Sequence, residues 1–264
     1  MRSAILALLA NAIVVAVVTT RHGAAQTTAP RTAALPPGLV YLSDIAPGIQ
    51  QDIRYAGANN FTGTRLPGYD AAECILTRDT ATALALVQAD LASTALSLQV
   101  YDCYRPERAS RAMTAWVNAA STSRTMNPAY NPHVPRGRLT ALGYIASRST
   151  HSRGDTVDLT LVAIEPVQRF ARPDATAIAC TAPIEVRQPD PSVDMGTAYD
   201  CFDPRSNTRS PEITASQREW RTRLVRAMRQ HGFVNYDKEW WHFTHRTGGG
   251  PSYDFPIPPR PRVP

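Results

Sequence analysis

Apolar residues recur at helical spacing in three stretches of this sequence, and each stretch predicts a helix packed against a core. The first helix is expected from Thr77 to Leu98, and the second follows Pro106, a residue that suits the first turn of a helix. The apolar faces are Leu84, Val87, Leu91 and Ala95 in the first helix, and Ala109, Ala112, Met113 and Trp116 in the second. We expect both faces to be buried.

The third predicted helix, from Ala215 to His231, carries a signal at each end. Thr214 and Gln217 have the spacing of a capping box, in which each side chain bonds the backbone of the other residue. Gly232 follows the last turn, where glycine commonly ends a helix. The side expected to be buried is formed by Trp220, Leu224 and Met228.

Between the second and third helices, apolar and polar residues alternate with the period of a strand. In the segment from Thr156 to Leu161, Asp158 shares a face with Thr156 and Thr160, which predicts a half-buried strand with a carboxylate on its polar side. Further strands are expected at Gln51 to Tyr55, Leu98 to Tyr101 and Lys238 to Thr244. Helices beside such strands favour an α+β fold, with a central antiparallel sheet flanked by helices, over a doubly wound parallel sheet.

The N-terminus has the pattern of a signal peptide over residues 1–25. Arg2 precedes an apolar run from Ala4 to Val18, and the small residues Gly23 and Ala25 follow. An uncleaved anchor needs about 18 apolar residues, so the shorter run favours cleavage and export to the periplasm or the exterior, with no stable membrane insertion afterwards. Residues 26–40 are expected to form a linker, residues 41–247 one folded domain, and residues 248–264 a Gly/Pro-rich tail.

Composition narrows the class of protein further. The chain has 264 residues, of which 43% are hydrophobic, which is enough for one sizeable core and too apolar for intrinsic disorder. Its formal net charge is +6, but the basic residues are scattered among acidic ones, and no basic stripe of the kind that binds nucleic acid is visible. The sequence also lacks a Gly-rich phosphate loop, which argues against nucleotide chemistry.

Four cysteines remain after the expected cleavage: Cys74, Cys103, Cys180 and Cys201. They form no C-x-x-C pair of the kind seen in zinc knuckles or redox motifs, and export would allow two disulfides. Three pairings are possible. We favour Cys74 with Cys103 and Cys180 with Cys201, because each pair closes a loop of moderate length.

Two short segments carry the candidate chemistry. His151 and Asp158 are separated by a turn-prone Ser-Arg-Gly, and Glu239 precedes His242 by three residues. Two histidines and one aspartate suit zinc and leave a fourth position for water. On a regular strand, residues three apart face opposite ways, so Glu239 and His242 would need a bulge or a strand end to meet. The remaining histidines of the mature chain are expected to be structural or solvated: His133, His231 and His245.

Five segments, in order along the chain, resemble the zinc D-alanyl-D-alanine dipeptidases. They are Asp52-Ile53-Arg54-Tyr55-Ala56 with Asn60-Phe61-Thr62-Gly63, Tyr101-Asp102-Cys103-Tyr104-Arg105-Pro106, Ser149 to Asp158, Asp194-Met195-Gly196-Thr197 with Asp200, and Glu239-Trp240-Trp241-His242. This family belongs to the D,D-peptidases, which share a fold with the hedgehog signalling domain. The resemblance covers nearly the whole mature chain.

The resemblance implies a catalytic role for each residue of the site. His151, Asp158 and His242 would hold one Zn²⁺ per chain, and Glu239 would act as the general base and then protonate the leaving amine. Arg105 would face the substrate carbonyl oxygen and stabilise its developing negative charge, although a structural salt bridge is the alternative for this residue.

The same resemblance suggests which residues hold the ends of a small D,D-dipeptide. Asp194 matches an acid expected near the substrate ammonium, although a turn before Met195 explains it equally well. Ser149 or Thr150 would support a substrate terminus through hydrogen bonds. Tyr55 would line the pocket or merely fill the sheet, and the sequence does not separate these two roles.

Two departures from the family bear on function. The stretch between Asp158 and Asp194 is longer than the compact family pattern, and Cys180 and Cys201 would hold it as a flap at the pocket rim, which leaves substrate length open. Export suits cell-wall turnover or scavenging of released dipeptide. The alternatives are a carboxypeptidase or endopeptidase on longer muropeptides and, less favoured, a zinc-stabilised module that binds peptidoglycan without cleaving it. Oligomeric state is not indicated.

Overall fold

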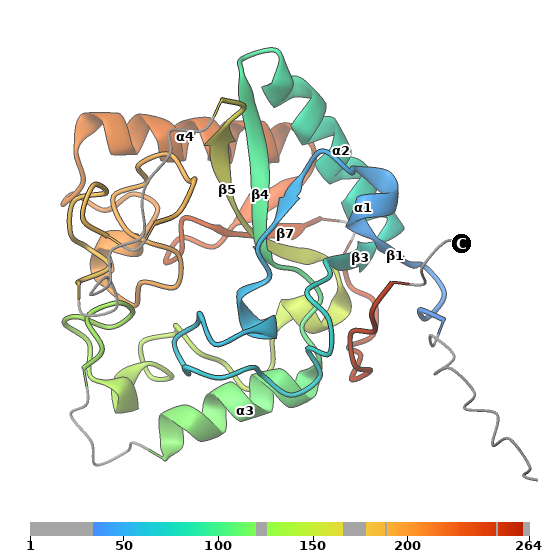
Figure 1. Ribbon diagram of the computed structural model, residues 1–264, viewed down its shortest axis with the longest axis horizontal. Coiled ribbons are helices and arrows are strands. Elements are labelled where there is room, and N and C mark those ends of the chain that lie inside the picture. The colour runs from blue at the N-terminus through green and yellow to red at the C-terminus, as the bar shows by residue number, and fades with distance from the viewer. Residues whose placement is uncertain (1–33, 120–125, 166–177, 188, 247, 261–264) are drawn as a thin grey trace, which may run out of the picture. The chain divides into compact units, whose positions relative to one another are not determined.

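The computed structural model describes residues 34–119, 126–165, 178–187, 189–246 and 248–260 (Figure 1). The expected signal peptide and most of the expected linker lie outside these residues. Within the described part of the chain, no helix combines the length and the apolar character needed to cross a membrane.

The described chain contains helices, short 3-10 helices and strands. The helices are α1 (Leu42–Ile45), α2 (Arg78–Ala92), α3 (Glu107–Asn118) and α4 (Ala215–Gln230). The 3-10 helices are η1 (Arg54–Ala56), η2 (Arg136–Arg138), η3 (Thr150–Arg153) and η5 (Pro204–Ser206). The strands are β1 (Leu39–Tyr41), β2 (Gln50–Gln51), β3 (Ile75–Thr77), β4 (Leu96–Asp102), β5 (Thr156–Ala163), β6 (Phe233–Asn235) and β7 (His242–His245).

A five-stranded sheet in the order β2-β4-β5-β7-β6 positions the candidate site (Figure 1). The pairs from β4 to β6 are antiparallel, as predicted, whereas β2 runs parallel to β4. The prediction of an antiparallel sheet is therefore wrong at this edge, because the chain crosses over through β3 and α2 before it returns as β4. Strands β1 and β3 form a separate antiparallel pair. The result is a mixed α/β architecture with helices flanking the sheets.

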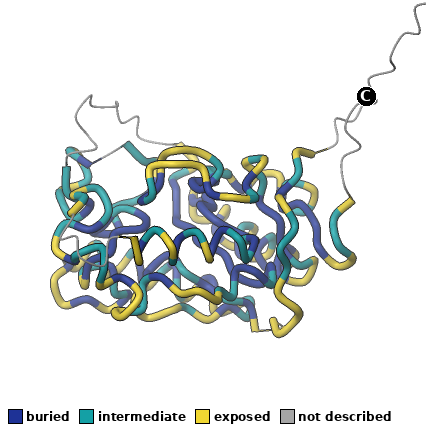
Figure 2. The backbone as a smooth tube through the Cα atoms, turned by 90° about the horizontal axis from the view of Figure 1, so that it is seen from below, coloured by how far each residue is buried: buried dark blue, intermediate teal, exposed yellow. Residues whose placement is uncertain are grey.

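Helices α2 and α4 contact each other and pack on the sheet, α2 against β4 and α4 against β5 and β6. Every residue of β5 except Ala163 is buried, so the prediction of a half-buried strand is wrong. Its polar side is covered by the segment that contains Ser192 and Tyr199: the Thr160 and Ser192 hydroxyls are 2.6 Å apart, and Tyr199 donates to Asp158. Figure 2 shows the buried segments in the interior and the exposed ones at the periphery.

The helix predictions hold, with corrections at their ends. α2 stops at Ala92, well before the predicted end, because Ala95 adopts a left-handed conformation (φ 57°) and the chain then enters β4. α3 begins at Glu107, so Pro106 is its N-cap and not a first-turn residue. Ala112 and Trp116 are only partly buried, and Ser110 and Val117 complete the buried face instead. In α4, both hydrogen bonds of the predicted capping box are present.

Two strand predictions are wrong in extent. β2 covers only Gln50–Gln51, and the chain turns into η1 because the Asn60 side chain donates to the carbonyls of Arg54, at 3.3 Å, and Gly57, at 2.8 Å. β7 begins at His242, since the four residues before it form a turn. Residues 248–260 contain neither helix nor strand, yet Ile257 is fully buried and Phe255 stacks on Tyr104.

Candidate metal centre

The structure brings His151, Asp158 and His242 together, with one ligand atom of each within 4.8 Å of the others. His151 Nε2 lies 3.3 Å from Asp158 Oδ1 and 3.3 Å from His242 Nδ1, and His242 Nδ1 lies 3.1 Å from Asp158 Oδ1. The three ligand atoms therefore form a nearly equilateral triangle.

Sheet register explains the placement of two of these three residues. Asp158 on β5 is directly opposite His242 on β7 in the antiparallel ladder, so both side chains project from the same face. The β4 ladder is irregular between Val100 and Asp102, and such an irregularity re-aims side chains. As a result, the side chains of two consecutive β4 residues both point toward this face. Tyr101 stacks on Tyr199, and Asp102 lies 3.4 Å from His151 Nδ1.

His151 is held by the turn that precedes β5. The Ser149 hydroxyl accepts a hydrogen bond from the His151 backbone N–H, and Gly154 ends the turn in a left-handed conformation (φ 75°). A Cβ at Gly154 would lie 2.9 Å from Leu39 Cδ2, so glycine fits this position best. The His151 Nδ1–H donates to the Cys103 carbonyl at 2.7 Å, which leaves the Nε2 lone pair directed at the triangle.

These residues fit a zinc ion. A tetrahedral ion with bonds of about 2.0–2.1 Å requires ligand atoms about 3.3 Å apart, close to the separations observed here. Asp158 Oδ1 is buried without a hydrogen-bond partner, which is costly for a carboxylate oxygen unless a cation binds it. Burial alone would raise the pKa of Asp158, but His151 and His242 outweigh burial and lower it, so the carboxylate is ready to bind a cation. Burial lowers the pKa of His242, which favours the neutral imidazole that metals bind.

Glu239 meets His242 because a turn joins them. The His242 N–H bonds the Glu239 carbonyl at 3.2 Å, and Glu239 Oε2 lies 3.6 Å from His242 Nδ1. Glu239 and His242 thus meet at the start of β7, which is the strand end that the sequence analysis required. Burial, followed by the negative charges of Asp158 and Asp200, raises the pKa of Glu239 well above its ordinary value. A buried carboxyl group beside the triangle is suited to exchange protons with a water molecule.

Arg105 lies against the same group of residues. Its guanidinium forms two contacts of 2.8 Å with Asp102 Oδ2, and its Nη2 is 3.7 Å from Asp158 Oδ2. Burial would lower the pKa of Arg105, but Asp102 and other neighbours raise it, so the cation is permanent. Arg105 therefore forms a structural salt bridge and also places positive charge at the candidate metal centre.

The sequence did not single out a hydrogen-bonded chain that borders the triangle. Tyr199 donates to Asp158 Oδ2 at 3.1 Å and lies 3.3 Å from the Tyr55 hydroxyl, which in turn donates to Asp200 at 2.7 Å. Burial and the charge of Asp158 raise the pKa of Asp200 to about 7. Asp200 stood in one of the matched segments, but Tyr199 carried no signal of its own.

The expected substrate residues fall into two groups. Tyr55 is connected to the site by its contact with the Tyr199 hydroxyl. Ser149 and Thr150 are half-buried next to His151. Asp194, in contrast, accepts hydrogen bonds from Arg187 at 2.8 Å, the Gly196 N–H at 3.0 Å and Gln217 at 2.8 Å. Its oxygens are thus occupied by a turn contact and by the side chains of Arg187 and Gln217, and the contacts described for it do not join it to the triangle.

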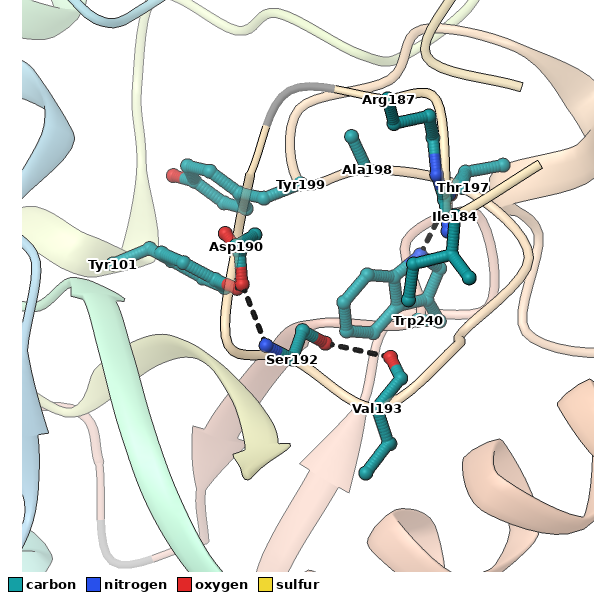
Figure 3. Close-up of a pocket in the computed structure, with 10 residues that line it drawn as sticks. All are labelled: Tyr101, Ile184, Arg187, Asp190, Ser192, Val193, Thr197, Ala198, Tyr199 and Trp240. Atoms are coloured by element: carbon teal, nitrogen blue, oxygen red, sulfur yellow. Dashed lines mark hydrogen bonds between the residues drawn. The ribbon is translucent and has the colours of Figure 1, made fainter. Parts of the chain in front are cut away.

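A small cavity separates the segment after Ile184 from β4 (Figure 3). It holds about 20 Å³, which is room for about one water molecule. Asp190 projects beside it and bonds the Tyr101 hydroxyl at 2.8 Å and Arg54 at 2.5 Å. Tyr199 lines this cavity and also bonds Asp158, so the cavity borders the candidate site.

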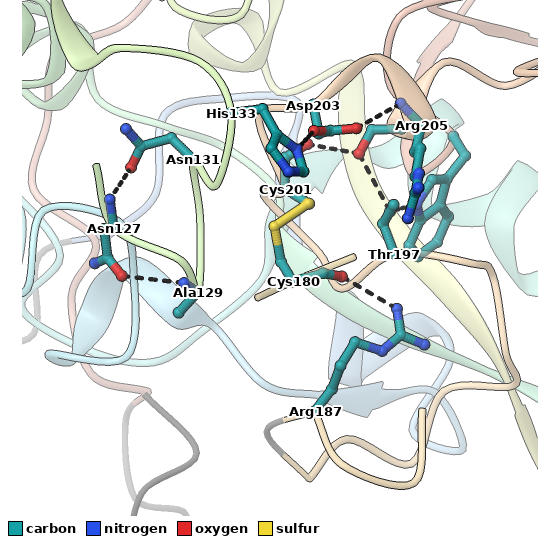
Figure 4. Close-up of a disulfide and its surroundings, with 12 residues drawn as sticks. Asn127, Ala129, Asn131, His133, Cys180, Arg187, Thr197, Cys201, Asp203 and Arg205 are labelled. Carbon is teal, nitrogen blue, oxygen red and sulfur yellow. Dashed lines mark hydrogen bonds and ion pairs between the residues drawn. A yellow bond between two sulfur atoms is a disulfide. The ribbon is translucent and has the colours of Figure 1, made fainter. Parts of the chain in front are cut away.

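The disulfides join Cys74 to Cys103 and Cys180 to Cys201, the pairing that loop length favoured. The first fixes Cys103, whose carbonyl accepts the hydrogen bond from the His151 Nδ1–H. The second anchors the segment that leads to Asp200 (Figure 4). The three other histidines have partners of their own: His133 pairs with Asp203, His231 pairs with Asp90, and His245 packs on Phe233.

Two histidines and a carboxylate that share one small triangle, with a glutamate and an arginine alongside, define the class of site found in metallohydrolases. Comparison with known proteins makes this specific. A family model described as D-ala-D-ala dipeptidase matches residues 36–172 and 165–258. The chain belongs to this family of metal-dependent peptidases, and the predicted resemblance is confirmed.

Curated relatives align with this chain over most of their own length. A D-alanyl-D-alanine dipeptidase of Enterococcus faecium is 30% identical over 222 residues, which cover 83% of this chain and 98% of the relative. One of Streptomyces coelicolor is 31% identical over 219 residues, covering 82% of this chain and 96% of the relative. One of Escherichia coli is 30% identical over 205 residues, which cover 78% of this chain and 83% of the relative. These proteins are similar to this chain across its folded part.

Proposed function

We propose that this protein is an exported zinc metallopeptidase that hydrolyses the dipeptide D-Ala-D-Ala in cell-wall peptide turnover. The observation that carries the proposal is the triangle of His151, Asp158 and His242, in which Asp158 Oδ1 has no hydrogen-bond partner and Glu239 lies alongside. Family membership and the names of the relatives support the substrate. Membership also supports the D,D-peptidase type of fold.

Each residue has a defined task in this proposal. When bound by the three ligands, zinc supplies Lewis acidity that acidifies water and polarises the peptide carbonyl. Glu239 accepts the proton of the attacking water and delivers it to the leaving amine, and no covalent intermediate forms. Arg105 stabilises the negative charge that develops on the carbonyl oxygen, a contribution worth about 3 kcal/mol for a comparable donor.

The charged ends of a dipeptide also need partners. Asp194 was the expected acid for the substrate ammonium, but its oxygens are bonded to Arg187, Gly196 and Gln217. Asp200 is the better candidate, because it connects to the triangle through Tyr55 and Tyr199. We therefore assign Asp200, with Tyr55, to the ammonium end. Ser149 and Thr150 remain candidates for hydrogen bonds to the substrate.

A matched pair of variants tests this assignment. Asp200→Asn removes the negative charge and should raise KM for D-Ala-D-Ala at least tenfold, because a buried ammonium loses its counter-charge. Asp194→Asn keeps the turn and should change KM less than threefold. Steady-state kinetics on both variants, with zinc content measured in parallel, would contradict the assignment if the larger KM effect fell on Asp194→Asn.

Export is supported by the two disulfides, which persist in oxidising compartments. The expected signal peptide at residues 1–25 is the second element of this part of the proposal. N-terminal sequencing of the secreted protein tests both export and the signal peptide, since cleavage should leave a chain that begins near Gln26.

Metal removal tests the function as a whole. The purified protein should contain about one zinc per chain, hydrolyse D-Ala-D-Ala, lose that activity on treatment with a chelator and regain it when zinc is restored. An N-blocked dipeptide and a tripeptide are assayed beside the free dipeptide. Cleavage of only the longer substrates would favour a carboxypeptidase or endopeptidase. Zinc binding without cleavage of any of these peptides would favour a peptidoglycan-binding module.

A further inference from the structure

The arginines that look scattered in the sequence gather in the fold. A groove of about 420 Å³ runs along α4, and its lining includes Arg209, Arg218, Arg226 and Arg229 but no acidic residue. No basic stripe is visible in the sequence, but the fold brings these arginines onto one face. Helical periodicity is the reason, because residues three or four apart on a helix fall on one side.

A second hollow continues this groove. It shares Thr208, Arg209, Val225 and Arg229 with the first, and it adds Arg246 along with one acidic residue, Asp237. From Arg218 to Arg229 the helix rises about 16 Å at 1.5 Å per residue, so the positive charge extends along a line.

Most of these arginines lack an internal partner. Arg218 donates to the carbonyls of Ser210 and Ile213, but Arg209, Arg226 and Arg229 are exposed and form no ion pair within the described part of the chain. Some exposed arginines elsewhere are paired, as Arg111 is with Asp254, whereas the exposed Arg65 and Arg78 form no ion pair within the described residues either. Arg226 and Arg229 also repel each other, so a binding role explains the arrangement better than helix stability does.

We propose that this groove binds a flexible chain of phosphodiester groups. Arginine is suited to phosphate because its planar guanidinium donates two parallel hydrogen bonds to the oxygens. A line of charge in a concave groove matches phosphates in series better than it matches a single ion or a flat membrane surface. The residues lining the part along α4 include no aromatic ring, so the stacking that nucleobases require is missing there and a chain without bases is favoured.

The probe is a fluorescent hexamer of propanediol phosphodiester, which carries the charges without bases and binds zinc weakly. Fluorescence anisotropy of the full-length protein at low salt should give saturable binding that weakens with added salt. Arg226→Glu/Arg229→Glu should weaken it at least tenfold. The control variant Arg65→Glu/Arg78→Glu changes the net charge equally at two exposed arginines outside the groove, and should weaken binding less than twofold.

Three outcomes would overturn the proposal. These are no binding of the hexamer by the wild-type protein, equal weakening in both variants, and groove-dependent binding only to vesicles of phosphatidylglycerol and phosphatidylcholine. The last outcome would assign the groove to a lipid surface. Far-ultraviolet circular dichroism establishes that each variant is folded. Dipeptide hydrolysis should be unchanged in the groove variant, because neither residue belongs to the candidate metal centre.

Discussion

Replacing Glu239 by glutamine is expected to lower kcat for D-Ala-D-Ala by about 10²–10⁴-fold, the contribution typical of a general acid–base residue. Glutamine preserves the size of the side chain but cannot take a proton from water. Glu239 is outside the triangle of ligand atoms, at 3.6 Å from His242 Nδ1, so zinc content should stay at one per chain. Stopped assays of product alanine, with metal analysis on the same sample, measure both quantities.

The exposed Glu219 on α4 provides the matched control. Glu219→Gln makes the same chemical change away from the candidate metal centre and should leave kcat within twofold of the wild-type value. A Glu239→Gln enzyme that kept its zinc and turned over at a near-normal rate would remove Glu239 from the role of base. Loss of zinc in that variant would instead indicate that Glu239 helps to hold the metal.

The sequence named the three residues of the triangle, but it did not give the geometry that brings them together. His151 and Asp158 are joined by a turn and a strand, both of which have local signatures. The position of His242 opposite Asp158 depends on the register of β5 with β7, and a long-range register leaves no mark in a single sequence. Donor chemistry suited to zinc and the resemblance to a family joined the two segments in advance, but neither gave the register.

Tertiary packing explains the wrong start of β7. Trp240 and Trp241 favour strands by propensity, which extended the predicted strand back to Lys238. Both rings are fully buried, and the Trp240 Nε1–H donates to the Thr197 hydroxyl at 2.8 Å. These contacts hold the two residues in a turn, and that turn places Glu239 beside His242. The local error therefore concealed the feature that the candidate site needs.

The choice of the aspartate that would bind the substrate ammonium shows a second limit of sequence reasoning. Asp194 and Asp200 stand six positions apart in one matched segment, and nothing local ranks one above the other. The fold separates them: Asp194 closes a turn, whereas Asp200 adopts a left-handed conformation (φ 57°) and reaches Tyr55. Such a backbone is uncommon for a residue other than glycine and has to be held by its surroundings.

Replacing Asp158 by asparagine is expected to weaken zinc binding at least about 100-fold, more than the loss seen for groups that only orient a ligand. The carboxylate supplies the one negative charge of the three-residue set, and its Oδ1 has no hydrogen-bond partner to replace a cation. A neutral amide of the same size fills the space but attracts the metal far less. Activity should fall with zinc occupancy and recover in part at high zinc concentration.

Thermal unfolding with and without zinc measures this effect independently of catalysis. A ligand at 100 times its Kd stabilises the native state by about 2.7 kcal/mol, so zinc should raise the Tm of the wild-type protein and leave that of Asp158→Asn nearly unchanged. Asp155→Asn is the control, since Asp155 is equally buried but bonded to Arg153 and Thr156. This control should lower Tm yet keep the increase caused by zinc. An equal increase in Asp158→Asn would exclude the carboxylate as a ligand, because binding energy that survives its neutralisation must come from other groups.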